Sequence, residues 1–571
     1  MSERLTRSAW TREDAKDPNH LLTREWLVTN GLGGYASGTI AGINTRRYHG
    51  LLVASLASPH GRTLLLNHLA EEVRLPDGSV LALTPEENPD GSFDFRDAGR
   101  LQEFRLEMGL PLWRYEIQDC VLEKRLLMPY MANTVIVLYR LLCGKGTVRL
   151  RLRPSMHFRT HGGKVDTPIE GHYTVSSVGE RYEVRSPQYE RPLRILAHGQ
   201  RASFVLDGGR FREMRYSVEA ARGYDSRGTL WSPGYIRADL TARGSAALIA
   251  STQPWEDITA FPPEKALEVE LQRRHRLLDK APVAARTGVA AELVLAADQF
   301  IIQPNTRRID QARANAEGDQ ARTIIAGYPW FTDWGRDTMI SLEGLTLVTG
   351  RHAEAGYILR TFLHYVRDGL IPNHFPEGSE EAIYNTADAS LWYFHALDRY
   401  LAATGDRLTL RMLLPTLQEI VDRHRAGTRF GIGMDHADGL LRQGMDGFAL
   451  TWMDAKVDDW VVTPRRGKTV EINALWYNAL RLLDRWAEEE LGDGRGASYR
   501  ELADRVRESF NKRYWFEEGG YLADIVDGER GDDLALRPNQ IFSISLPHPV
   551  LDPARWESVL ETCRRELLSP V

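Results

Sequence analysis

The chain has 571 residues, with 72 lysines and arginines against 78 aspartates and glutamates, for a formal net charge of −6. At roughly 150 residues per domain this length predicts several domains, and a composition of 43% hydrophobic and 26% charged residues is that of a globular protein with a sizeable core. The negative net charge excludes a basic surface for nucleic acid. The three cysteines, Cys120, Cys143 and Cys563, lie too far apart for a disulfide framework or a CxxC zinc site.

No segment of the sequence is typical of a membrane or export signal. The first 18 residues are polar and charged, without the apolar region of a signal peptide. No run approaches the ~18 apolar residues of a membrane span. We therefore expect a cytoplasmic protein that binds neither membrane nor nucleic acid.

The first half of the chain has the pattern of β-strands. Residues 148–153 alternate strictly between apolar side chains and arginine, and residues 134–139 are β-branched and apolar, as in a buried strand. Glycine, proline, asparagine and aspartate interrupt this half at short intervals. Many short strands between turns predict an N-terminal antiparallel β-sandwich over residues 1–270.

The motif Gly31-Leu32-Gly33-Gly34-Tyr35-Ala36 in this half fits the glycine pattern of a dinucleotide site. Such a site needs a helix next and an acidic residue about 20 positions later. Neither follows, since Ser37-Gly38-Thr39 begins a helix poorly and no acid occurs before Glu71. We therefore expect these glycines to form tight turns.

The second half has helical periodicity. We expect residues 271–287 to form a basic helical linker and residues 288–571 to form an all-α domain. Apolar residues recur there at three- and four-residue spacing, which predicts about nine helices. The expected helices are residues 290–302, 337–348, 352–367, 387–403, 408–424, 470–489, 499–514, 538–546 and 553–567.

The highest density of side chains that could catalyse a reaction or bind a sugar lies in a loop that ends at a predicted helix start. Trp330, Asp333, Trp334, Arg336 and Asp337 fall within eight positions, where plain loops carry small polar residues. Asp337 could simply accept hydrogen bonds from the first amides of the helix. Alternatively, tryptophan rings cover the apolar faces of sugars, and a carboxyl among aromatic rings keeps its proton near neutral pH. That is the environment of a general acid.

Other helix starts repeat this combination of acid and aromatic residues. Trp452 and Asp454 lie in a loop, and Glu471 and Asp388 lie in the first turn or at the cap of a predicted helix. Capping and favourable interaction with the helix dipole are the simpler explanation for each. If the helix starts converge, however, they line one pocket with acids and aromatic rings.

The absence of other catalytic motifs narrows the range of reactions that the sequence could support. The sequence contains no HExxH, GxSxG or Walker A motif, and we expect no metal and no cofactor. Carboxylate acid/base chemistry on a neutral, polyhydroxylated substrate remains, which indicates glycoside cleavage.

The motifs resemble those of bacterial and archaeal glycogen debranching enzymes. Residues 25–35 and 45–52 are similar to the N-terminal signature of that family. Residues 330–338, 451–455 and 470–480 are similar to its amylo-α-1,6-glucosidase domain. The similarity runs in the same order over nearly the whole chain. It implies an N-terminal β-sandwich followed by a glucoamylase-like (α/α)6 barrel, and hydrolysis of α-1,6-linked glucose in glycogen or maltodextrin with inversion at the anomeric carbon.

The resemblance also implies roles for individual residues, with Asp337 as the general acid. The side chains expected to hold sugar hydroxyls, stack on glucose or reach the pocket rim are Arg336, Asp333, Asp388, Asp454 and Glu471, then Trp330, Trp334 and Trp452, and finally Arg47 and His49.

Six helical hairpins make an (α/α)6 barrel, and about nine helices are too few. The resemblance places the family's general base in helices beyond residue 571. We therefore expect a truncated chain, or a barrel completed by a partner chain or by self-association, or recruitment of Asp454 or Glu471 as base. The alternative functions are a glucoamylase- or trehalase-like exo-α-glucosidase and a non-catalytic glucan-binding protein.

Overall fold

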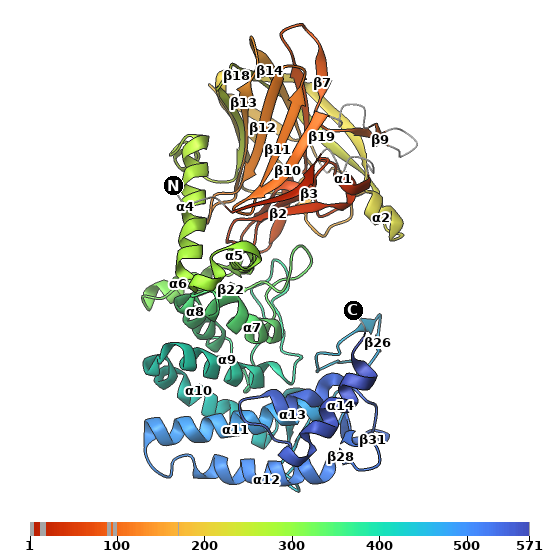
Figure 1. The fold of residues 1–571 in the computed structure, drawn as a ribbon, viewed down its shortest axis with the longest axis vertical. Coiled ribbons are helices and arrows are strands. Elements are labelled where there is room, and N and C mark those ends of the chain that lie inside the picture. The colour runs from red at the N-terminus through yellow and green to blue at the C-terminus, as the bar shows by residue number, and fades with distance from the viewer. Residues whose placement is uncertain (1–4, 12–18, 88–92, 95–99, 170, 570–571) are drawn as a thin grey trace. The chain divides into compact units, whose positions relative to one another are not determined.

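The structure is a computed structural model that describes residues 5–11, 19–87, 93–94, 100–169 and 171–569 (Figure 1). The chain divides into two compact units. The first comprises residues 1–309, 327–330 and 377–379, and the second comprises residues 310–326, 331–376 and 380–571. The first unit therefore continues past the predicted linker.

The first unit consists mainly of two antiparallel sheets (Figure 1). The large sheet has 13 strands in the order β1-β10-β11-β12-β13-β20-β18-β19-β14-β6-β7, with β17 on β18 and β16 on β17, and the smaller sheet has five in the order β15-β5-β4-β3-β2. Their strands are β1 Thr6–Thr11, β2 Glu25–Thr29, β3 Tyr35–Thr39, β4 Gly50–Ser55, β5 Arg62–Leu66, β6 His68–Arg74, β7 Val80–Ala82, β10 Leu101–Glu107, β11 Leu110–Ile117, β12 Cys120–Leu127, β13 Thr134–Cys143, β14 Val148–Ser155, β15 Arg159–Thr160, β16 Thr174–Val178, β17 Arg181–Arg185, β18 Leu193–Arg215, β19 Arg227–Leu240 and β20 Ser245–Ser251.

Side-chain alternation explains how these strands build a core. In β14, Val148, Leu150 and Leu152 are buried while the arginines between them are partly exposed, which confirms the predicted alternation. One hydrophobic cluster contains Val28 and Leu52 of the smaller sheet together with residues of β13 and β14. The two sheets therefore share one core.

The glycine motif forms a turn between β2 and β3. Gly31 and Gly33 have φ angles of 75° and 91°, in the left-handed region that side chains other than glycine rarely adopt. A Cβ atom on Gly31 would lie 2.3 Å from the Tyr130 ring. The turn therefore requires glycine for both conformation and space, as the sequence predicts.

Five helices of the first unit surround or follow the strands. They are α1 Asn19–Thr23, α2 Ser217–Ala221, α3 Trp255–Ile258, α4 Pro263–Lys280 and α5 Gly288–Phe300. Part of the predicted linker is thus the end of α4, a regular helix.

The second unit is helical and contains only short two- or three-stranded sheets among its described residues. Helix α11 is buried around almost its whole circumference, as expected for a helix packed between others, and it contacts α9, α10 and α12. No helix in the described part of the chain is long and apolar enough to cross a membrane. The helices are α6 Arg308–Ala316 (which begins in the first unit), α7 Gly335–Leu342, α8 His352–Leu363, α9 Ala389–Thr404, α10 Arg407–Ala426, α11 Val470–Leu491, α12 Ala497–Arg513, α13 Phe542–Ser545 and α14 Trp556–Leu567.

In the second half of the chain, two predicted helices differ clearly from the observed ones, and one observed helix has no predicted counterpart; the short helices α1, α2 and α3 of the first unit were not predicted either. The helix expected at 337–348 begins earlier and changes to a π-helix at Glu343–Leu347. The segment 538–546 is a 3₁₀ turn followed by the four-residue α13. Helix α6 is polar over most of its length, so periodicity did not reveal it.

Candidate active site

A cavity of about 680 Å³ opens in the helical unit, a size that suits a small ligand. Its walls come from the starts of α7, α9 and α11, from the loops that contain Phe331 and Trp452, and from the 3₁₀ turn that leads into α13. Of the side chains predicted from the sequence, it brings together Trp334, Arg336, Asp337, Asp388, Trp452, Asp454 and Glu471. The other side chains that line it were not among the predicted site residues, although Phe331 and Trp392 belong to the motifs singled out; they are Phe331, Ile340, Trp392, Asn539 and Phe542.

Arg336 holds two of the cavity's carboxylates. Its Nε donates to both oxygens of Asp388, at 2.9 and 2.7 Å, and its Nη1 lies 3.5 Å from Asp454 Oδ2. Arg336 and Asp388 are both buried. The arginine therefore neutralises charge that burial would otherwise make costly.

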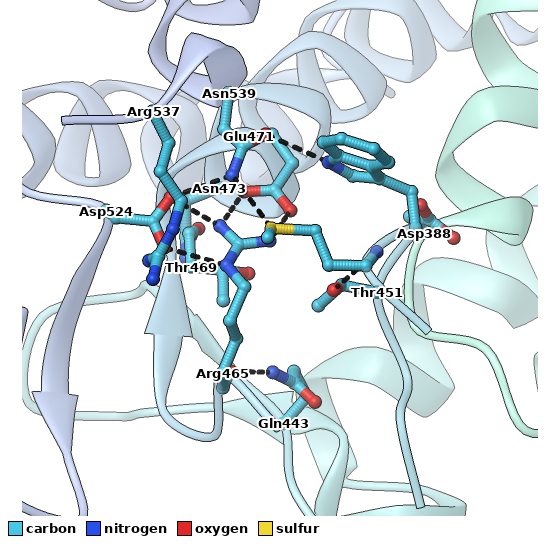
Figure 2. A network of polar contacts seen from close by, with 12 residues as sticks. Asp388, Gln443, Thr451, Arg465, Thr469, Glu471, Asn473, Asp524, Arg537 and Asn539 are labelled. Atoms are coloured by element: carbon cyan, nitrogen blue, oxygen red, sulfur yellow. Dashed lines mark hydrogen bonds and ion pairs between the residues drawn. The ribbon is translucent and has the colours of Figure 1, made fainter. Parts of the chain in front are cut away.

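Glu471, in the first turn of α11, is fixed by a second arginine (Figure 2). Arg465 donates from Nη1 and Nη2 to the two Glu471 oxygens, and the Nη2 contact measures 2.7 Å. The same guanidinium donates from Nε and Nη2 to Asp524, at 2.7 Å each. Burial raises the pKa of Glu471 and Arg465 opposes that shift. With both oxygens occupied by an arginine, Glu471 is suited to accept hydrogen bonds rather than to exchange a proton.

Asp337 lines the cavity without such a partner. Among the described residues none forms an ion pair with its side chain, and Asp337 is an exposed residue. Partial desolvation of its carboxyl raises the pKa of Asp337, Arg336 lowers it, and the nearby charges of Asp454 and Asp388 raise it further. A carboxyl whose pKa is raised keeps its proton closer to neutral pH, as a general acid requires.

Aromatic side chains form the remaining walls. The Trp334 ring stacks on His374 with 4.6 Å between centroids, and Phe331 meets it edge-on at 6.1 Å. Trp392 meets Phe542 edge-on at 5.2 Å. Trp452 lines the cavity and is 45% exposed, so part of its ring is available to a ligand. Such rings can pack against the apolar face of a sugar.

Four predicted site residues lie outside the cavity lining. Asp333 is buried and accepts a hydrogen bond from Thr323 at 2.9 Å. The other three belong to the first unit: the Trp330 ring packs edge-on against Tyr48, the Arg47 backbone N–H donates to Glu219, and His49 Nε2 lies 3.4 Å from Glu25. Roles for these four in binding stay predictions.

The residues that hold the predicted site residues in place carry little signal in the sequence. Arg465 precedes Glu471 by six positions in a loop rich in basic residues, so the pairing could have been suspected. Asp524 and Asn539 lie far from it along the chain, and neither belongs to a recognisable motif. Only the fold brings them together.

Among the described residues, one group of three acids could hold a metal ion: Asp435, Asp438 and Asp527. The buried ammonium of Lys468 lies 2.9, 2.7 and 2.7 Å from these three carboxylates. The lysine thus supplies the positive charge at this position.

Two family models match the chain in order. Residues 24–247 match the glycogen debranching enzyme N terminal, and residues 295–571 match amylo-alpha-1,6-glucosidase. The chain belongs to the glycogen debranching enzyme family.

A curated relative agrees with this assignment. The chain is 25% identical over 340 residues to the glycogen debranching enzyme of Saccharomyces cerevisiae (strain ATCC 204508 / S288c). That similarity covers 44% of this chain and 22% of the yeast protein, so the chain corresponds to a fraction of the relative's length.

The fold resembles that of a bacterial glucoamylase solved in complex with acarbose. The TM-score is 0.52 at 10% sequence identity, and the match covers 99% of this chain and 80% of that one. The likeness confirms the expected class, an antiparallel β domain followed by a glucoamylase-like helical domain. That the helical unit forms an (α/α)6 barrel, complete or not, stays a prediction.

Proposed function

We propose that the cavity of the helical unit removes α-1,6-linked glucose from glycogen or another branched α-glucan by inverting acid/base hydrolysis. Family membership supports this reaction, and the glucoamylase-like fold supports the substrate class. The observation that carries the proposal is the position of Asp337. It lies in a cavity walled by tryptophan rings, its pKa is raised despite the nearby charge of Arg336, and no arginine forms an ion pair with it among the described residues.

Each group then has a distinct task. Asp337 donates its proton to the departing glycosidic oxygen as the bond to the anomeric carbon breaks. Asp388 and Glu471, fixed by arginines, accept hydrogen bonds from sugar hydroxyls. Trp334 and Trp452 pack against the sugar ring.

Inversion needs a second carboxylate that activates water, about 6.5–9.5 Å from the acid. Asp388 and Glu471 are poor candidates because arginines occupy their oxygens. Asp454 is 42% exposed and meets Arg336 only at 3.5 Å. Among the cavity carboxylates that the structure describes, Asp454 is therefore the candidate for the second role.

The test measures glucose release from a branched limit dextrin, from linear maltooligosaccharides and from trehalose. We expect release from the branched dextrin to be fastest. Asp337→Asn should lower that rate by about 10²–10⁴, whereas Asp446→Asn should not, because the Asp446 side chain is 96% exposed and lies outside the cavity lining. Faster hydrolysis of the linear substrate or of trehalose would favour the exo-glucosidase alternatives. Binding without release, unchanged in Asp337→Asn, would favour a glucan-binding protein.

A second substrate distinguishes the general acid of the reaction from the general base. α-Glucosyl fluoride has a leaving group that needs no proton, so an enzyme without its general acid still hydrolyses it, whereas an enzyme without its base does not. We expect Asp337→Asn to keep most of this activity and Asp454→Asn to lose it. The opposite pattern would exchange the two roles.

A further inference from the structure

The indole of Trp452 is held in one orientation by a buried amide. Its Nε1 donates to Asn539 Oδ1 at 2.9 Å. Asn539 is itself 2% exposed. A partly exposed tryptophan would otherwise sample several rotamers, so this hydrogen bond limits the orientations in which the ring can meet a sugar.

Asp524 determines which way the Asn539 amide points (Figure 2). Asn539 Nδ2 donates to Asp524 Oδ1 at 2.8 Å. A carboxylate accepts and does not donate, so the amide must turn its nitrogen toward Asp524 and its oxygen toward the indole. The orientation of Trp452 therefore depends on the charge of a residue that it does not contact.

Asp524 also supports the other wall of the cavity. It is 2% exposed, and Arg465 and Arg537 both donate to it. The guanidinium of Arg465 also donates a hydrogen bond to Glu471. One buried carboxylate is thus joined through Asn539 to the aromatic wall and through Arg465 to an acceptor of hydroxyls.

We propose that Asp524 is a positioning residue that fixes Trp452 and Glu471 relative to each other so that one glucose residue fits both. This inference rests on the proposed function, because it takes a sugar as the ligand of the cavity. It assigns to Asp524 an effect on binding and not on proton transfer, since it lies behind the cavity lining.

The variants are Asp524→Asn, which keeps the shape and removes the charge, and Asn539→Ser, which is too short to bridge Asp524 and the indole but changes no charge. The matched control is Asp533→Asn. Asp533 also pairs with Arg537, at 2.9 Å. Its side chain makes no hydrogen bond or ion pair with Arg465 or Asn539 in the part of the chain that the structure describes, although the charges of Asp533 and Arg465 lie close enough to attract each other. The control therefore perturbs Arg537 without breaking the hydrogen bonds that join Asp524 to Asn539 and to Arg465.

The kinetic readout is the division of the effect between KM and kcat on the branched dextrin. Loss of two oriented contacts should raise KM by about tenfold in Asp524→Asn and change kcat by less than about threefold. In a Trp452→Phe background, which lacks the indole donor, the effect of Asp524→Asn on KM should shrink because the two residues act together. Additive effects, an equal rise in KM for Asp533→Asn, or a loss confined to kcat would overturn the proposal.

A second readout does not depend on hydrolysis. In the full chain labelled with ¹⁵N-tryptophan, the indole N–H signal that disappears in Trp452→Phe belongs to Trp452. This signal should shift and exchange faster with water in Asp524→Asn and Asn539→Ser, and stay unchanged in Asp533→Asn. An unmoved signal in both test variants would refute the positioning role even if wild type proved inactive. A wild type that releases no glucose while the signal moves as expected would count against the proposed function alone.

Discussion

Replacing Arg336 by methionine should destabilise the helical unit strongly, because it leaves the buried carboxylate of Asp388 without its positively charged partner. Asp388 is 1% exposed and receives both of its strongest contacts from Arg336 Nε. After the substitution, the hydroxyl of Thr386 still donates a hydrogen bond to the Asp388 carboxylate, at 2.9 Å, but no positive charge faces it at that distance among the described residues. Removing one partner of a buried ion pair typically costs about 3–5 kcal/mol, which lowers Tm by about 6–20 °C for a unit of this size.

The double variant Arg336→Met/Asp388→Asn separates this cost from a general loss of packing. It removes both charges, so we expect it to recover at least half of the lost stability. Arg564→Met is the exposed control: its ion pair with Glu561 leaves the two side chains 66% and 54% exposed, so its effect should stay within about 0.5 kcal/mol. Thermal unfolding followed by circular dichroism measures all three. A Tm for Arg336→Met equal to that of the Arg564→Met control, or a double variant no more stable than the single, would refute the reasoning.

Two further predictions concern the first turn of α7, which contains both Gly335 and Asp337. Burial raises the pKa of Asp337, so the folded state binds its proton more tightly than the unfolded chain, and stability falls as pH rises from the unfolded to the folded pKa. Asp337→Asn should therefore have a Tm at pH 7 that is no lower than that of wild type, and the difference between the two should vanish in acid. The kcat/KM of wild type should fall as pH rises through the raised pKa of Asp337. A Tm of Asp337→Asn below that of wild type at pH 7 would contradict this. A Cβ on Gly335 would lie 2.1 Å from the carbonyl oxygen of Pro372, so Gly335→Ala should cost about 1–3 kcal/mol. Gly344→Ala, which meets nothing within 4 Å, should be neutral or stabilising by up to about 1 kcal/mol; equal melting temperatures for the two alanine variants would disprove the steric argument.

Local patterns predicted the elements well where one side of an element is buried. The alternation at 148–153 became β14, and the apolar stripe at 470–489 became α11. Periodicity failed for α6, which is polar, and at Glu343–Leu347, where the helix widens to a π-helix. Neither departure changes the pattern of apolar residues enough to be read from the sequence.

The candidate site was predicted in part because helix starts have sequence signatures. Asp337, Asp388 and Glu471 were expected at such starts, and the structure places them around one cavity. Asp524 and Asn539 could not be predicted, because their importance comes from contacts between segments that are distant along the chain. Proximity in sequence also misled: Asp333 lies four positions before Asp337 and its side chain is directed to Thr323.

The central claim is that the cavity hydrolyses an α-glucosidic branch with inversion, and the anomer released first tests it most directly. Proton NMR of the first minutes of reaction with a branched limit dextrin distinguishes β-glucose from α-glucose before they equilibrate. Inversion of an α-linkage predicts β-glucose as the first product. Initial release of α-glucose, or no release from α-1,6 branches, would contradict the account.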